Sequence, residues 1–310
     1  MRASLATTPA GTTTPATSSS SSTTSGPRGP SLAVGHSFGA NALTNAALLH
    51  PRLFSAGLVL LDPVIGHFDS TPVTLRLGPA ALSVNRRDVW PSRADAAASF
   101  RRSKFYQAWD PRVLDRWIDF GLRDVPASAA SPAGKSDDDA GSAFNADGSK
   151  VIHQERCPDL DDNLNPSVSN WPLYRAEGGN TMVRLPNVRP AVLYVIGGQS
   201  VTITPDVVRE RTAITGTGTG GSGGAAQGRV RQVTHPDHGH LIPMEAPAYC
   251  ARHAAEWAKG ELDRWWAEEK EYDQWTKKPL AERTTVSDEY RRYLGVQDSN
   301  GAKIPPKPKI

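Results

Sequence analysis

One serine lies in a five-residue pattern that is typical of a catalytic nucleophile. Residues 35–39 read Gly-His-Ser-Phe-Gly, between an apolar stretch and a run with helical spacing. In such a G-x-S-x-G turn the hydroxyl is lifted out of the backbone, glycines at both flanks let neighbouring elements approach closely, and the helix N-terminus stabilises negative charge. A second match, residues 220–224, lies in a glycine-rich stretch without a strand or helix. We therefore predict Ser37, and not Ser222, as a nucleophile.

A serine nucleophile needs a general base, and a histidine takes this role most often. Residues 239–245, Gly-His-Leu-Ile-Pro-Met-Glu, follow the last predicted strand and precede a long predicted helix. We predict His240 as the base, with His238 as the competing candidate. His235, Asp237, His238 and His240 could instead bind zinc, but no cysteine or distant third ligand accompanies them. We therefore expect neither a metal nor another cofactor.

The third member of such a site is a carboxylate that fixes the tautomer of the histidine. The loop after the third predicted strand, residues 198–202, holds Ser200 where a carboxylate would be expected. Asp206 comes a few residues later, at the start of a predicted helix, which is a position typical of a helix cap. Asp62 ends the strand that follows the nucleophile helix. We favour Asp62 as the acid and keep Asp206 as the alternative.

The elements that must position these residues form an α/β pattern. A short apolar run, a helical repeat and a second apolar run follow one another with short links, which indicates a βαβ unit and a parallel sheet. The predicted elements are strands at residues 32–34 and 58–61 joined by a helix at 38–49, later strands at 191–196 and 230–234, and a long helix that begins at Pro247.

A middle section of different character separates the second strand from the third. Helices are predicted at residues 95–103 and 111–122, with Phe105, Trp109 and Trp117 as candidate lid aromatics, although such stripes are more often plain core. Residues 151–187 read as polar and irregular, and residues 215–228 as a flexible glycine-rich insert. The predicted organisation is a disordered N-terminus (1–30), a core (31–63 and 188–262), a helical lid (64–187) with a disordered insert (127–150), and a C-terminal helical extension and tail (263–310).

Composition excludes several classes of protein. The net charge of +3 is too small to indicate a nucleic-acid partner. Cys157 and Cys250 are far apart, so a disulfide framework is not expected and a reducing compartment is the default. No apolar run is long enough for a transmembrane helix, and the N-terminus lacks the apolar core of a secretory signal.

Five tracts of the sequence together carry a family resemblance: His36–Asn41, His50–Phe54, Leu60–Ile65, Arg101–Leu114 and Gly239–Glu245. They resemble fungal α/β-hydrolases linked to host-selective toxin biosynthesis and to a peroxisomal lipase-like protein. The resemblance covers roughly residues 31–294 and implies an α/β-hydrolase fold with a mostly parallel sheet and a helical lid. It also implies an ester- or thioester-cleaving serine hydrolase with Ser37 and His240 in its triad.

The sequence departs from that family before the nucleophile. Members of the family have about four strands there and a His-Gly loop that supplies one oxyanion-hole N–H. The Phe38 N–H can supply one donor. The second donor has no evident source, because residues 1–30, where that loop would be expected, are low in complexity. Loss of one donor typically costs roughly 100- to 1000-fold in rate. We therefore expect the first strands of the fold to be missing, as in a truncated product or an incomplete gene model with low activity.

The sequence thus predicts a serine hydrolase of the lipase and esterase kind. The resemblance implies that its substrate is a small apolar ester or acyl-thioester in secondary-metabolite or lipid metabolism. The alternatives are a catalytically impaired relative that binds without turnover, and an acyltransferase that uses the same triad. The C-terminal Pro308-Lys309-Ile310 is a degenerate peroxisomal signal. It predicts a peroxisomal import receptor as partner, with the cytoplasm as the other location.

Overall fold

The computed structural model describes residues 29–67, 87–124, 152–153 and 177–295. The chain divides into two compact units, Met1–Lys259 and Gly260–Ile310. Ser37, Asp62 and His240 all belong to the first unit. The stretches predicted to be disordered, residues 1–30 and 127–150, fall almost entirely outside the described residues, as does the C-terminal tripeptide.

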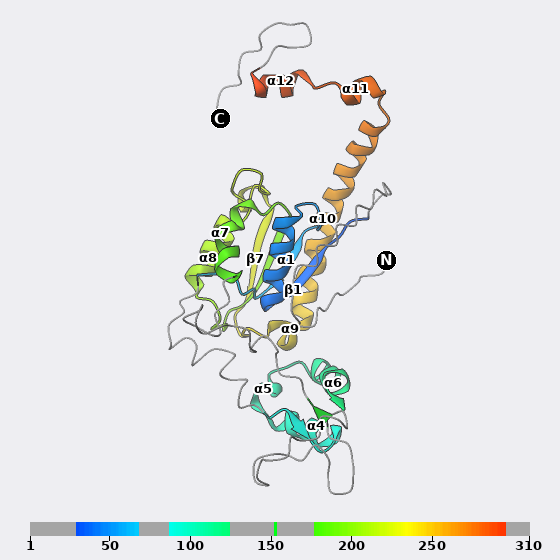
Figure 1. The fold of residues 1–310 in the computed structure, drawn as a ribbon. Helices are drawn as coiled ribbons and strands as arrows, with labels where there is room; N and C mark the ends of the chain where they lie inside the picture. Colours follow the sequence, from blue (N-terminus) through cyan, green and yellow to red (C-terminus); the bar gives the residue numbers. More distant parts are fainter. Residues whose placement is uncertain (1–28, 68–86, 125–151, 154–176, 296–310) are drawn as a thin grey trace, which may run out of the picture. The chain divides into compact units, whose positions relative to one another are not determined.

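Four parallel strands form the main sheet of the first unit (Figure 1). They are β1 (Ala33–His36), β2 (Leu58–Leu61), β6 (Val192–Gly197) and β7 (Val230–His235), hydrogen-bonded in the order β1-β2-β6-β7. All four were predicted, and their ends differ from the prediction by at most two residues. Leu61 pairs with both His36 and Val195, and Gly197 pairs with His235. The loops that leave the carboxyl ends of these strands therefore start at one edge of the sheet, where ligands bind in open α/β sheets.

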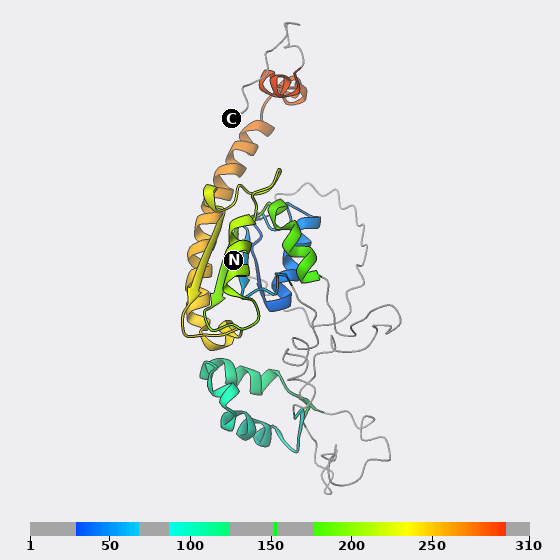
Figure 2. The ribbon, with the colours of Figure 1, turned by 90° about the vertical axis from the view of Figure 1, so that its left-hand side faces the viewer.

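Helices cover both faces of this sheet (Figures 1 and 2). Successive strand residues point to opposite faces, so Leu58 and Leu60 pack with α1 (Ser37–Leu49), α7 (Glu177–Arg184) and α8 (Pro205–Ile214). Val59 and Leu61 pack with α9 (Ile242–Glu245) and the first part of α10 (Pro247–Thr276). All four of these side chains are buried. Each such burial contributes about 1.5–3 kcal/mol, which fixes the strand that directly precedes Asp62.

Residues 87–124 form a helical insert with a core of its own. Its helices α4 (Arg93–Arg102), α5 (Lys104–Gln107) and α6 (Pro111–Phe120) surround buried aromatic side chains. Ser92 caps α4, and Asp110 caps α6 with Pro111 in the first turn. Both long helices were predicted, but α5 and a small antiparallel sheet were not. That sheet is made of β3 (Val89–Trp90), β5 (Ile152–His153) and β4 (Arg123–Asp124), in that order.

The prediction of an irregular segment at residues 151–187 is wrong for its last part. Helix α7 spans Glu177–Arg184 and is followed by a 3₁₀ turn at Leu185–Asn187. Met182 and Leu185 are fully buried against the sheet face that carries α1. Two consecutive glycines at the start of α7 weaken the helical signal, because glycine has a low helix propensity. Burial of Met182 and Leu185 overrides that propensity.

The glycine-rich stretch 215–228 was predicted to be a flexible insert, and this is also wrong. Its backbone N–H groups donate to the carbonyl groups that follow α7: Gly216 to Leu185 (2.9 Å), Gly218 to Pro186 (2.8 Å) and Ser222 to Val188 (3.0 Å). Gly216 and Gly220 have φ values of 74° and 82°, which L-residues rarely adopt. The glycines therefore allow a hydrogen-bonded loop rather than a linker.

The second unit is helical in its described part. It contains the last residues of α10, then α11 (Leu280–Thr284) and α12 (Asp288–Leu294). Ser287 caps α12, and Gly295, with a φ of 64°, ends it in the left-handed conformation. Across the described residues, no helix is long and apolar enough to span a membrane.

Candidate active site

Ser37 lies at a sharp turn from β1 into α1. His36 is extended, with φ −114° and ψ 144°, and Ser37 then has a φ of 55°. A positive φ in a non-glycine residue is strained and is frequent at functional sites. A Cβ atom on Gly35 would lie 2.7 Å from Leu43 Cδ1 and 2.9 Å from the Ala40 backbone, so only glycine fits there. The expected close approach fails at Gly39, where a Cβ atom would meet no described atom within 4 Å.

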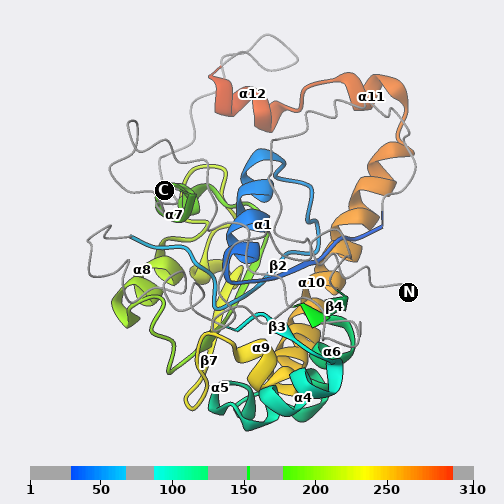
Figure 3. The ribbon, with the colours of Figure 1, turned by 60° about the horizontal axis from the view of Figure 1, so that its bottom comes forward.

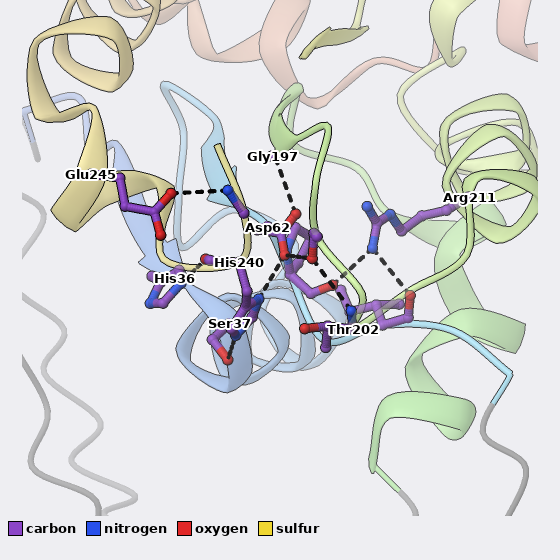
Figure 4. Close-up of polar contacts among 12 residues, drawn as sticks. His36, Ser37, Asp62, Gly197, Thr202, Arg211, His240 and Glu245 are labelled. Atoms are coloured by element: carbon purple, nitrogen blue, oxygen red, sulfur yellow. Dashed lines mark hydrogen bonds and ion pairs between the residues drawn. The ribbon is translucent and has the colours of Figure 1, made fainter. Parts of the chain in front are cut away.

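His240 connects two residues that are far apart in the sequence (Figure 4). Its Nε2 lies 2.9 Å from Ser37 Oγ, and its Nδ1 lies 2.6 Å from Asp62 Oδ2. Because the carboxylate only accepts, Nδ1 carries the proton in the neutral ring, and Nε2 accepts from the Ser37 hydroxyl. The His240 side chain is 22% exposed and that of Asp62 is 6% exposed. The site therefore opens to solvent on the histidine and serine side while the acid is buried.

Asp62 directly follows β2, with a φ of 38°. Its Oδ1 accepts from the Gly197 N–H (3.3 Å), and its Oδ2 accepts from the Ser200 hydroxyl (2.6 Å) as well as from His240. Ser200, which stands where the sequence lacks a carboxylate, thus contacts the carboxylate that comes from the neighbouring strand. These three donors fix the orientation of the carboxyl group.

The alternative acid, Asp206, lies elsewhere. It is in the first turn of α8, its side chain is 84% exposed, and it pairs with Arg209 on the same helix. None of its contacts is with His240. Among the two candidates, only Asp62 is brought to the histidine.

The competing base, His238, is also turned away from Ser37. Its Nδ1 lies 3.4 Å from Glu245 Oε2, and its ring centroid is 4.3 Å from that of His235. The same Glu245 oxygen accepts from the Gly239 N–H at 2.9 Å, so it anchors the turn just before the general-base candidate (Figure 4). In the part of the chain that the structure describes, no group of histidine, cysteine and carboxylate side chains could hold a metal ion.

His36 is a part of the site that the sequence reasoning missed. Its Nε2 donates to the His240 carbonyl oxygen at 2.8 Å, and the two ring centroids are 4.9 Å apart. Burial lowers the pKa of His36, and the hydrogen bond to the His240 carbonyl group opposes this only in part. The ring is therefore kept neutral, with its proton on Nε2. His36 occupies the variable position before the serine of the G-x-S-x-G pattern. That position gave only a weak signal, because nothing near it in the sequence indicates a contact with His240.

The helical insert contacts the loop that carries His240. The Asp110 N–H donates to the Met244 carbonyl oxygen at 2.9 Å, and Leu241 and Met244 pack against the aromatic core of the insert. Figure 3 shows α9, which includes Met244, beside α4, α5 and α6. Of the predicted lid aromatics, Trp109 is buried in the insert core and Phe105 is 47% exposed.

Phe38, the predicted oxyanion donor, directly follows Ser37 in the first turn of α1. Backbone N–H groups in a first turn have no acceptor within the helix and carry the positive end of the helix dipole. Residues 1–30, which were expected from the sequence to supply no second donor, lie almost entirely outside the described residues.

Comparison with known proteins identifies the family. An abhydrolase domain-containing protein of Alternaria alternata is 32% identical over 250 residues, which are 76% of this chain and 86% of that protein. The chain belongs to the α/β-hydrolase family. The resemblance and the fold class predicted from the sequence are thereby confirmed. No protein-family profile matches this α/β-hydrolase.

Two further similarities concern longer proteins. A type I acyl-CoA thioesterase of Penicillium brevicompactum is 36% identical over 273 residues, which are 78% of this α/β-hydrolase and 61% of the thioesterase. The chain thus spans about three fifths of the length of the thioesterases that it matches. A peroxisomal α/β-hydrolase of Saccharomyces cerevisiae superposes with a TM-score of 0.49 and 16% identity, over 86% of this chain and 59% of that one.

Proposed function

We propose that this α/β-hydrolase is a serine hydrolase that cleaves an ester or acyl-thioester bond of a small apolar substrate. The observation that carries the proposal is the hydrogen-bonded chain from Asp62 through His240 to Ser37, with distances of 2.6 and 2.9 Å. A buried carboxylate, a histidine and a strained serine in this order are the parts needed for nucleophilic acyl transfer.

The proposed reaction has two halves. Ser37 Oγ attacks the acyl carbon while His240 Nε2 takes its proton, and His240 then returns that proton to the departing alcohol or thiol as the C–O or C–S bond breaks. A water molecule gives its proton to His240 and attacks the acyl-serine, and Ser37 Oγ leaves with that proton. Asp62 stays ionised and stabilises the imidazolium that forms in each half. The Phe38 N–H is the proposed donor to the developing oxyanion.

Two observations favour an acyl substrate. The similar Penicillium proteins are acyl-CoA thioesterases, and the helical insert places an aromatic cluster against the loop that carries His240. We propose that this insert serves as the lid over an apolar acyl group. The C-terminal residues 308–310 support the further proposal of import into the peroxisome, with the cytoplasm as the alternative.

A fluorophosphonate probe tests the nucleophile directly. Because it forms a covalent bond only with an activated serine, we expect the full chain to be labelled once, at Ser37, with loss of labelling in Ser37→Ala. The matched control is Ser222→Ala, which removes the serine of the second G-x-S-x-G match and should label like the wild type. Peptide mapping locates the adduct. An unlabelled wild type would instead support the non-catalytic binding protein.

Substrate class is tested with the same variants. The wild type should release free thiol from medium-chain acyl-CoA or alcohol from p-nitrophenyl esters, and Ser37→Ala should not. Product analysis with added alcohol or amine acceptors separates hydrolysis from acyl transfer. Formation of the acceptor adduct as the main product would overturn hydrolysis as the reaction.

A further inference from the structure

Arg211 on α8 is a buried charge that the proposed reaction does not use. It is 1% exposed, and its guanidinium carbon lies 4.9 Å from the centroid of the Tyr194 ring. Its Nε has no hydrogen-bond partner in the described structure. Burial lowers the pKa of Arg211, opposed by the nearby Asp62 carboxylate, but an arginine remains protonated. Burying a charge is costly unless hydrogen bonds compensate it, so its partners matter.

The partners of Arg211 are main-chain carbonyl groups beside Asp62 (Figure 4). One nitrogen, Nη1, donates to the carbonyl oxygen atoms of Pro63 (2.8 Å) and Ile65 (3.1 Å). Both belong to the irregular segment that directly follows the acid. A buried segment without regular structure needs such side-chain donors to satisfy its carbonyl groups.

The residue between those two carbonyl groups is bound from the opposite side. The Val64 N–H donates to the Ser37 carbonyl oxygen (3.1 Å), and the Val64 carbonyl oxygen accepts from Asn41 Nδ2 (2.9 Å). Asn41 lies on α1, one turn after the nucleophile. The segment after Asp62 is therefore held between the helix that carries Ser37 and the guanidinium on α8.

We infer that Arg211 is a positioning residue that fixes the carboxylate of Asp62 by holding the carbonyl groups of residues 63 and 65. The inference rests on the proposed function, since it needs Asp62 to act as the triad acid. The three donors to the carboxyl group act on the side chain of Asp62, whereas its backbone is strained, with a φ of 38°, and continues directly into the segment that Arg211 holds. Released from Arg211, the segment can relax and move the carboxylate. A displacement of about 1 Å at a catalytic group can cost roughly 100-fold in rate.

The test compares Arg211→Met with Arg209→Met, a matched control on the same helix whose side chain is 70% exposed. In the full chain we expect Arg211→Met to lower kcat by roughly 10- to 100-fold with little change in KM, and Arg209→Met to match the wild type. Arg211→Met is also combined with Asp62→Asn. Because Arg211 acts through Asp62, Arg211→Met should cause almost no further loss of kcat in a chain that already carries Asp62→Asn. Two independent sites would instead give additive losses in activation free energy.

The outcomes distinguish failure of the Arg211 inference from failure of the proposed function. A folded Arg211→Met with wild-type kcat, or a loss that is additive with that of Asp62→Asn, overturns the positioning role and leaves the proposed function intact. A wild type that neither labels nor hydrolyses overturns both. If Arg211→Met lacks a cooperative melting transition, Arg211→Gln replaces it, because glutamine keeps a polar side chain but is too short to reach both carbonyl groups. It should lower kcat in the same non-additive way, and a wild-type kcat would overturn the inference.

Discussion

Replacement of Asp62 by asparagine should nearly abolish turnover while the fold survives. The carboxylate accepts on both oxygens, from Gly197 on Oδ1 and from His240 and Ser200 on Oδ2. An amide cannot satisfy both sides. If its NH₂ faces His240, that ring must place its proton on Nε2 and can no longer accept from Ser37.

The opposite amide orientation keeps the productive tautomer but leaves the buried Gly197 N–H without an acceptor. That costs about 1–3 kcal/mol, so only about one molecule in 5 to 150 is competent. The competent molecules also lack the negative charge that stabilises the imidazolium. Together these losses approach the roughly 10⁴-fold fall in kcat known for this substitution in a Ser-His-Asp triad.

The assay is kcat for an ester or acyl-CoA substrate, together with the rate of fluorophosphonate labelling, for Asp62→Asn and for Asp206→Asn. Asp206 is the matched control because it is exposed and pairs with Arg209 on its own helix. Asp206→Asn should retain wild-type kcat. The reasoning is refuted if Asp62→Asn keeps kcat within about tenfold of the wild type, or if Asp206→Asn is the impaired variant.

Two further predictions concern the stability of the elbow. Gly35→Ala should lower the free energy of unfolding by about 1–3 kcal/mol, because its Cβ would lie 2.9 Å from the Ala40 backbone. The exposed Gly39→Ala should instead raise that free energy by about 0.4–1 kcal/mol; equal destabilisation of both in urea melts would contradict this. His36 has its pKa lowered by burial, so below the unfolded pKa of 6.5 the unfolded chain binds more protons and stability falls as the pH drops. The decrease in the free energy of unfolding between pH 7 and pH 5 should be smaller in His36→Gln than in the wild type. In the exposed control His50→Gln this decrease should equal that of the wild type. If His36→Gln shows the same decrease as the wild type, His36 is not the source of the pH dependence.

Local patterns in the sequence sufficed for the elbow and the strands of the sheet. Ser37 could be chosen over Ser222 because only the first lies between an apolar run and a helical repeat. The strand Leu58–Leu61 was predicted with its observed ends, since four consecutive apolar residues indicate burial on both faces. Predictions failed where glycine dominates. The helix Glu177–Arg184 and the loop after α8 are stabilised by distant partners that local propensity does not contain.

The assembled site could be predicted only in part, because its members are widely separated in the sequence. His240 lies 203 residues from Ser37 and 178 from Asp62. Both Asp62 and Asp206 were compatible with the pattern, and only the pairing of β2 with β6 and β6 with β7 brings one of them to the histidine.

The sequence by itself determined which serine can be a nucleophile, since strain, burial and helix spacing around Ser37 are encoded within about fifteen neighbouring residues. Tertiary structure decided which carboxylate contacts His240 and which groups hold it there. His36 donates to the main chain of a loop some 200 residues away, and Arg211 binds carbonyl groups beside Asp62 across 148 and 146 residues. The acceptors in these contacts are backbone carbonyl groups, which every residue has. The residue types at positions 63, 65 and 240 therefore do not predict the contacts.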